Sequence, residues 1–223
     1  MRDEEYRGVV ARVVARYARS GRVAQGFVRG KLRHDPVFRS LVDRGLAESP
    51  RVVDLGCGRG ILLALMLEAR RSPDPPGLHG VELAAAPARI AREALDGAAA
   101  IVEADLGAIE VPECDAVAIL DVLHYLAPDV QTDLLARVRA ALPVDGRLFI
   151  READAGAGAG FFAVTAGERL CAIARGDGIR RFSYVEAGSL TARLEALGFK
   201  VGVTPMGGGT PFANLLWEAR VSP

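Results

Sequence analysis

Short apolar segments alternate with amphipathic segments along most of this chain of 223 residues. The apolar segments are rich in Val, Ile and Leu, and residues 115–121 form one that is bounded by an acid at each end. Such segments are typical of strands that are buried on both faces of a sheet. In the amphipathic segments apolar residues recur every three or four positions, which is the period of a helix. The alternation predicts right-handed crossovers and a mostly parallel sheet with helices on both faces.

From residue 50 onward the predicted elements follow this alternation in order. After a first strand that includes Val52 and Val53, strands are expected at residues 77–82, 98–103, 115–121, 147–151, 199–203 and 212–221. Helices are expected at residues 61–68, 87–95, 128–142 and 189–197. The turn-rich residues 206–211 between the last two strands predict an antiparallel hairpin, so the last strand would be reversed.

The most informative segment is Val-Val-Asp-Leu-Gly-Cys-Gly-Arg-Gly at residues 52–60. An apolar run ends near an acid, three glycines follow at every second position, and a run of helix formers begins. The pattern indicates a strand, a glycine-rich turn and a helix, which brings backbone close to a ligand. Glycine suits such a turn because it tolerates positive φ. Dinucleotide-binding loops have the different spacing G-x-G-x-x-G.

This motif resembles the first signature of the class I S-adenosylmethionine-dependent methyltransferases, an acid followed by three alternating glycines. The matching residues are Asp54, Gly56, Gly58 and Gly60. The resemblance covers about residues 50–221. It implies an α/β, Rossmann-like sheet of seven strands, mostly parallel with an antiparallel last strand. It also implies that the loop packs against the amino-acid part of S-adenosylmethionine.

Acids at the ends of later strands extend the expected cofactor site, since ligands of open α/β sheets bind beyond the carboxyl ends of strands. Glu82 could accept both ribose hydroxyls; a surface acid near a helix start is the alternative. Asp105 resembles the acid that binds the adenine amine, and a turn cap is its alternative. The predicted cofactor-binding residues are Asp54, Gly56, Cys57, Gly58, Gly60, Glu82, Leu83, Asp105, Leu106, Asp121 and Val122.

His124 follows the fourth strand, in the segment Asp121–Leu126 that is expected to border the methyl group. Methyl transfer depends largely on holding the nucleophile in line with the methyl carbon and sulfur. A hydroxyl or amine acceptor can also need a general base, and an imidazole titrates near neutral pH. His124 is therefore the catalytic candidate. A partly buried histidine that only packs beneath a lid is the alternative.

Two regions are expected to form the substrate pocket. Residues 156–184 combine aromatic and arginine side chains, which suit an acidic or carboxylated small molecule. A solvated helix with an apolar core face is the alternative for most of them. The predicted substrate contacts are Lys31, Tyr125, Arg151, Arg181 and Tyr184.

Residues 1–46 are expected to form a helical cap, and residues 47–223 the methyltransferase domain. Tyr6, Val9, Val13 and Tyr17 recur at helical steps, which predicts an amphipathic first helix. A second segment brings basic residues and a helix that begins at Pro36. The cap could be a lid over the cofactor, a dimer contact or a cover for one sheet face.

Composition narrows the function classes. Twenty-eight basic residues balance 28 acidic residues, so no global field attracts nucleic acid or an anionic membrane. No apolar stretch reaches the roughly 18 residues that a membrane span requires, and the N-terminus does not resemble a secretory signal. The three cysteines lack metal-site or disulfide spacing. We expect a cytoplasmic enzyme, monomeric or homodimeric, without a metal and with a small-molecule substrate.

The predicted function is transfer of a methyl group from S-adenosylmethionine to a small-molecule acceptor. Oxygen is the favoured acceptor atom, and nitrogen and carbon remain open. The first alternative is an NAD(P)-dependent oxidoreductase, which the glycine spacing and the lack of a Tyr-x-x-x-Lys pair disfavour. The second is a cofactor-binding subunit without catalysis, because Rossmann-like folds serve many functions.

Overall fold

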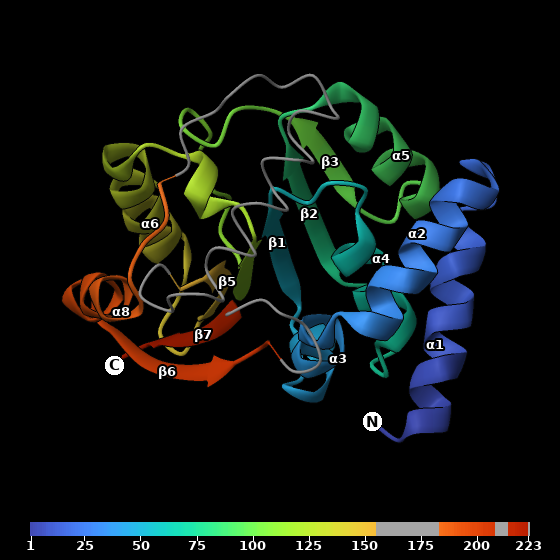
Figure 1. Cartoon of the computed structure of the whole chain (residues 1–223), viewed down its shortest axis with the longest axis horizontal. Coiled ribbons are helices and arrows are strands. Elements are labelled where there is room, and N and C mark those ends of the chain that lie inside the picture. The colour runs from blue at the N-terminus through green and yellow to red at the C-terminus, as the bar shows by residue number, and fades with distance from the viewer. Residues whose placement is uncertain (155–182, 208–213, 223) are drawn as a thin grey trace. The chain divides into compact units, whose positions relative to one another are not determined.

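The computed structural model describes residues 1–154, 183–207 and 214–222 (Figure 1). Within them, seven strands form one sheet of order β3-β2-β1-β4-β5-β7-β6. The strands are β1 (Arg51–Leu55), β2 (Gly77–Glu82), β3 (Ala100–Glu103), β4 (Ala116–Leu120), β5 (Arg147–Ala153), β6 (Phe199–Pro205) and β7 (Asn214–Val221). The chain divides into two compact units, residues 1–118 and residues 119–223.

The expected helices are all present, and one further helix, α2, lies within residues 1–46, which were expected to form a helical cap. They are α1 (Asp3–Arg16), α2 (Gly21–His34), α3 (Pro36–Asp43), α4 (Ile61–Ala69), α5 (Ala85–Leu95), α6 (Pro128–Ala141) and α8 (Ala187–Ala196), with short 3₁₀ turns η1 (Leu46–Glu48) and η2 (Leu123–Tyr125). Helix α3 begins where Asp35 caps it: the Asp35 carboxylate accepts the Val37 N–H at 3.2 Å, and proline occupies the first turn.

In the first unit β1 pairs in parallel with β2, and β2 with β3. Helix α4 is apolar on nearly every side, and its residues 61–66 are all buried. Helix α1 packs against α4 (Figure 1), with Val9 and Val13 buried and with Arg12 and Arg16 both paired to Glu68. The N-terminal helices thus belong to the core of this unit. The domain boundary expected at residue 46 stays a prediction.

Close packing behind the glycine-rich loop explains a glycine inside β2. A Cβ atom on Gly80 would lie 2.7 Å from Ile101 Cδ1, 2.8 Å from Cys57 Sγ and 2.9 Å from Leu63 Cδ1. At these distances a Cβ atom would force all three neighbouring side chains to shift. Gly80 therefore lets α4 pack closely on β2 and lets Gly56 and Cys57 of the loop bond to Val81 O in β2.

In the second unit β7 is antiparallel to both of its neighbours, β5 and β6. The predicted terminal hairpin and reversed last strand are therefore confirmed. Helix α8 packs on β6 and β7. The fully buried Trp217 anchors that contact, with its indole N–H donating to Thr191 Oγ1 at 3.1 Å.

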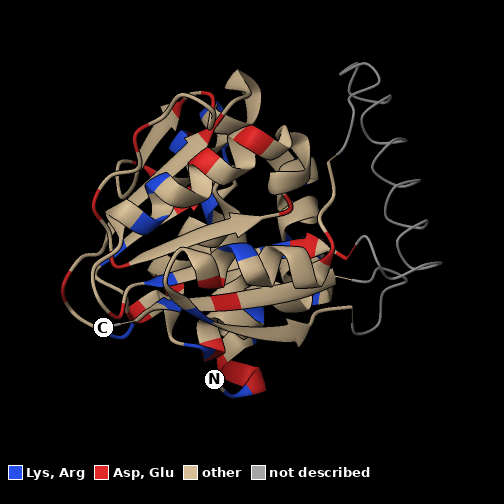
Figure 2. Ribbon diagram, turned by 90° about the vertical axis from the view of Figure 1, so that its left-hand side faces the viewer, with Lys and Arg blue, Asp and Glu red and all other residues tan. Residues whose placement is uncertain are grey.

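Figure 2 shows Lys and Arg interspersed with Asp and Glu along the described helices and strands, as the equal totals of the two charge types lead one to expect. Among the described residues, no helix is both long enough and apolar enough to cross a bilayer.

Candidate functional site

The backbone of the glycine-rich loop is left-handed at all three motif glycines. The φ angles are 80° at Gly56, 54° at Gly58 and 74° at Gly60. Residues with a Cβ adopt this region at a cost, so glycine is favoured at each position. The sequence prediction of a strand, a glycine turn and a helix is confirmed by β1, the loop and α4.

Four N–H groups of the loop are bonded within the protein itself. Gly56 N and Cys57 N both donate to Val81 O, at 2.8 and 2.9 Å, and Gly60 N donates to Cys57 O at 2.8 Å. Gly58 N donates to Glu82 Oε2 at 2.9 Å. A phosphate-binding loop directs its N–H groups at the anion instead. This loop is consequently poorly suited to hold a pyrophosphate.

The acid of the motif, Asp54, is buried with 3% of its surface exposed. Burial raises the pKa of this carboxyl to about 7, and the nearby charge of Glu82 adds to the rise. A positively charged ligand group would favour the ionised form of Asp54. At Gly58 the position of an added Cβ is open, with no atom within 4 Å. Two carboxylates beside an open loop face fit a cationic ligand such as S-adenosylmethionine.

The other predicted cofactor residues of the first unit differ in their surroundings. Glu82 also accepts the Ala84 N–H at 2.9 Å, so its carboxylate stabilises the turn that follows β2. Leu83 is 53% exposed, whereas Leu106 is buried. Asp105 accepts the Gly107 N–H at 2.8 Å. This is the turn cap that was the alternative for Asp105, and its contact with adenine stays a prediction.

Helix α1 supports the loop through a residue that sequence reasoning did not select. The fully buried Tyr17 donates its hydroxyl to Arg59 O at 2.9 Å. The Arg59 guanidinium lies over the ring of Phe27 in α2, 4.6 Å from its centroid. Tyr17 could be recognised in the sequence only as one more apolar residue at a helical step.

In the second unit the chain turns sharply after β4. Asp121 has a φ of 58°, an uncommon angle for a residue with a Cβ. Its N–H donates to Arg151 O at 2.9 Å, and its carboxylate pairs with the Arg151 guanidinium. Arg151 is buried with 3% exposure. The Arg151 side chain thus stabilises the turn at Asp121. A contact between Arg151 and the substrate stays a prediction.

His124 lies directly after this turn and is bonded to a carboxylate from β5. His124 Nδ1 and Glu152 Oε2 are 2.6 Å apart, and both residues are buried. Glu152 Oε1 also accepts the N–H groups of Val122 and Leu123, at 2.9 and 2.6 Å. Burial raises the pKa of Glu152, and the hydrogen bond with His124 opposes that rise. The two backbone N–H groups favour the ionised form of Glu152, and the ring does so as well when His124 Nδ1 carries the hydrogen.

Two aromatic rings flank the imidazole. The Tyr184 ring is stacked on His124, with centroids 4.9 Å apart and planes at 11°, and the Tyr125 ring is tilted at 4.2 Å. The structure therefore brings together His124 and two predicted substrate residues. Sequence reasoning did not select Glu152, which lies one residue beyond the strand expected at 147–151; in the structure β5 continues to Ala153, and Glu152 is buried within it.

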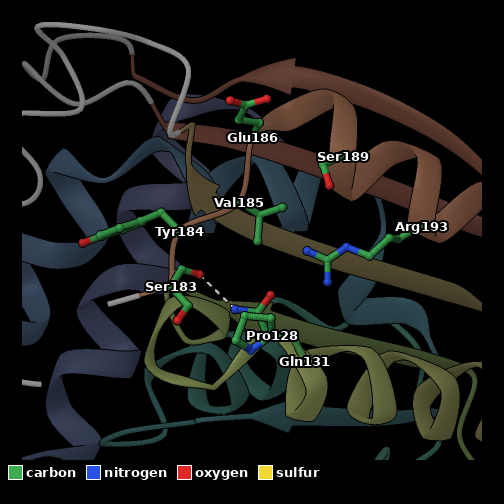
Figure 3. Close-up of a pocket in the computed structure, with 8 residues that line it drawn as sticks. All are labelled: Pro128, Gln131, Ser183, Tyr184, Val185, Glu186, Ser189 and Arg193. Carbon is green, nitrogen blue, oxygen red and sulfur yellow. Dashed lines mark hydrogen bonds between the residues drawn. The ribbon is translucent and has the colours of Figure 1, made fainter. Parts of the chain in front are cut away.

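Beside this cluster, helices α6 and α8 and residues 183–186 line an open cavity of about 260 Å³ (Figure 3). Figure 3 shows the side chains of Tyr184 and Val185 pointing to opposite sides of the chain. The lining residues are Pro128, Gln131, Ser183, Tyr184, Val185, Glu186, Ser189 and Arg193.

The two remaining predicted substrate residues are Lys31 of the first unit and Arg181. Lys31 forms an ion pair with Asp35 at 2.8 Å on helix α2. Arg181 lies outside the described residues, as does most of the expected pocket segment 156–184. Within the described part of the chain, no group of three or more His, Cys, Asp and Glu side chains could hold a metal ion.

A family model described as a methyltransferase domain matches residues 6–202. This chain belongs to the methyltransferase family. The resemblance carried by Asp54 and the three glycines is thereby confirmed, and the oxidoreductase alternative is not supported. No curated protein sequence matches this chain.

Solved structures share the fold of this methyltransferase at low sequence identity. An O-methyltransferase family protein from Burkholderia thailandensis aligns with a TM-score of 0.69 and 18% identity, over 87% of this chain and 57% of that one. Magnesium protoporphyrin IX methyltransferase from Synechocystis PCC 6803, with bound SAH, aligns with a TM-score of 0.62 and 19% identity, over 90% and 88%. The mitomycin 7-O-methyltransferase structure gives 0.62 and 20%, over 97% and 68%.

These likenesses confirm the predicted fold class, a Rossmann-like sheet of seven strands with a reversed last strand. The present chain spans only 57% of the length of the Burkholderia protein.

Proposed function

We propose that this chain binds S-adenosylmethionine and transfers its methyl group to the oxygen of a small-molecule acceptor. The family, the glycine-rich loop and its internally bonded N–H groups support this cofactor over a dinucleotide. The observation that carries the choice of acceptor is the buried pair of His124 and Glu152. A hydroxyl must lose its proton as it attacks a methyl group, and an oriented imidazole can take that proton.

In this proposal Glu152 orients the base and His124 moves the proton. Glu152 accepts the Nδ1–H of the imidazole, which leaves Nε2 as the basic nitrogen. His124 Nε2 would take the hydroxyl proton as the acceptor oxygen receives the methyl group. The negative charge of Glu152 stabilises the imidazolium that forms. The cofactor, when bound, supplies a methyl group on a sulfonium that leaves as a neutral thioether.

On the side of the cofactor, the residues proposed to hold it are the Asp54 and Glu82 carboxylates and the open loop face at Gly58. Asp54 in its ionised form would offset positive charge on the ligand. Glu82 would bind the ribose with oxygens that already organise the loop. The contacts predicted at Asp105 and Asp121 belong to the same proposal.

For the acceptor, Tyr125 and Tyr184 are the proposed contacts, since both rings touch the imidazole. Aromatic walls suit a flat, ring-containing molecule. A cytoplasmic location and a monomeric or homodimeric state accompany the proposal as predictions from the sequence.

Thermal unfolding with candidate cofactors tests the first half of the proposal. A ligand that binds the folded state raises the Tm by mass action. S-adenosylhomocysteine should raise the Tm and NAD should not. A rise with NAD and none with S-adenosylhomocysteine would overturn the proposed cofactor.

Incubation with methyl-labelled S-adenosylmethionine and a panel of phenols, amines and thiols tests the second half. Label is expected in at least one phenol, and its transfer should depend on His124. Label in amines alone would move the acceptor atom from oxygen to nitrogen. Cofactor binding without transfer to any acceptor would favour a non-catalytic subunit.

A further inference from the structure

Gln131 is a buried amide in the first turns of α6, with 1% of its surface exposed. Its Nε2 lies within hydrogen-bond distance of three backbone carbonyls: Leu123 O at 3.0 Å, Leu126 O at 3.1 Å and Ser183 O at 2.9 Å. An amide nitrogen has two hydrogens, so at least one of these bonds is shared. One side chain therefore ties together two segments that are far apart in the sequence.

Both tied segments hold the imidazole of His124. Leu123 and Leu126 lie on either side of His124 in the chain, within and just after η2. Ser183 precedes Tyr184, whose ring is stacked on the imidazole. The Ser183 N–H also donates to His124 O at 2.8 Å. Gln131 thus fixes the backbone of the base and the backbone of its stacking partner together.

The Gln131 amide bonds to the backbone of the segment that carries Tyr184. Figure 3 shows Gln131 bonded to Ser183 at the wall of the cavity, while the Tyr184 side chain extends away from that wall. The amide contacts the backbone that carries the imidazole and its stacking partner. Any effect of Gln131 on chemistry must then pass through the backbone of residues 123–126 and 183.

We infer that Gln131 is a positioning residue for methyl transfer, which sets the plane of the His124 ring through three backbone carbonyls. This inference rests on the proposed function, in which His124 is the base. Glu152 fixes one nitrogen of the ring, and Gln131 fixes the two segments between which the ring lies. A donor matters here because three carbonyls converge on the amide and a buried carbonyl without a donor is costly, although Leu123 O also accepts the Leu126 N–H at 2.9 Å.

The first test measures the imidazole itself and needs no substrate. The variant Gln131→Met keeps the shape of the side chain and removes the donor. The matched control is Thr132→Val, which removes a hydroxyl bonded to Pro128 O at 2.9 Å on the same helix. In ¹⁵N NMR the His124 ring signals should shift and broaden in Gln131→Met and stay unchanged in Thr132→Val. Signals of His34 and His79 provide an internal reference.

The second test is a double-mutant cycle with the phenol that accepts label in the transfer assay. Gln131→Met should lower kcat by about ten- to a hundredfold, since small misplacements of a reacting group have effects of this size. The KM for S-adenosylmethionine should stay within twofold. With His124→Ala already present, Gln131→Met should have no further effect on kcat.

Each outcome decides one of the two claims. An equal loss of kcat with and without His124, or unchanged His124 signals in Gln131→Met, would overturn the role of Gln131. If Gln131→Met does not fold, Gln131→Asn, whose shorter amide cannot reach both segments, replaces it in the same comparison. If the unmodified chain transfers no methyl group, the proposed function fails, and the NMR comparison still shows whether Gln131 holds the ring.

Discussion

The glycine-rich loop of the first unit and the His124 cluster of the second unit are built in opposite ways. The loop is made mainly of backbone: Gly56 and Cys57 bond to the carbonyl of Val81 in the adjacent strand. The cluster depends on side chains that reach across the sequence: His124 bonds to the Glu152 side chain 28 positions away, and the Gln131 amide bonds to the Ser183 backbone carbonyl 52 positions away. A backbone site depends on φ angles and close approach, whereas a side-chain cluster depends on matched donors and acceptors.

This difference separates the expected effects of mutation. Changes in the loop should alter cofactor affinity and stability, because the same backbone conformation packs against β2 and forms the proposed binding surface. Changes in the cluster should alter the rate and leave cofactor affinity nearly intact. The following variants, in order of decreasing expected effect, test that separation.

Removing the base should have the largest effect. His124→Ala should lower kcat by about 10²–10⁴-fold, the usual loss for a general base. The pH profile of kcat should lose its acidic limb, because the imidazole is the group that takes the proton.

Glu152→Gln keeps an acceptor for the Nδ1–H but loses the negative charge, so a smaller loss of kcat is expected.

Steady-state kinetics and calorimetric titration of S-adenosylmethionine measure the two sides of this prediction. Cofactor affinity should stay near that of the unmodified chain in both variants. An unchanged kcat and pH profile in His124→Ala would reduce His124 to a packing residue.

Removing Glu82 should have the next largest effect, and on the other side of the comparison. Its carboxylate accepts the N–H groups of Gly58 and Ala84. Charge-assisted hydrogen bonds contribute about 1.5–3 kcal/mol each. Glu82→Ala should therefore weaken S-adenosylmethionine binding by at least tenfold, and should also lower stability because the loop loses a support.

Glu82→Gln is the control, since its amide oxygen can still accept one of the two N–H groups. Calorimetric titration should rank the unmodified chain first, Glu82→Gln second and Glu82→Ala last. Equal affinity in all three would make Glu82 a structural acid without a role in cofactor binding.

Two glycine variants give the smallest expected effect and the sharpest comparison within the loop. Gly58 and Gly60 both have positive φ, so alanine at either position costs about 1–2 kcal/mol in backbone strain. At Gly60 an added Cβ would also lie 3.0 Å from Ala91 Cβ and 3.1 Å from Leu95 Cδ1. At Gly58 it would point into open space.

Gly60→Ala is therefore expected to lower the free energy of unfolding by more than Gly58→Ala does. Gly58→Ala should have the larger effect on cofactor affinity relative to its loss of stability, because its methyl group projects from the open loop face. Urea unfolding and calorimetric titration of both variants measure this. The reverse ranking in stability would contradict the packing seen behind Gly60.

Sequence pattern predicted the secondary structure closely. The strand expected at residues 115–121 is β4, Ala116–Leu120, and the helix expected at 87–95 is α5, which begins two residues earlier at Ala85. Such elements follow from apolar periods and turn residues, which are properties of a short window of sequence. The cofactor loop was predictable for the same reason, because its three glycines occupy the positive φ angles of a single turn.

By itself, then, the sequence determined the order of strands and helices, the glycine-rich loop and the family. Only the tertiary structure decided that Glu152 bonds to His124, that Tyr17 supports the loop and that Gln131 joins the two segments around the base. An acid in a buried strand has the same local pattern whether its partner is a histidine, an arginine or the backbone. Its partner is set by the packing of segments far apart in the chain, and no local period or spacing records that packing.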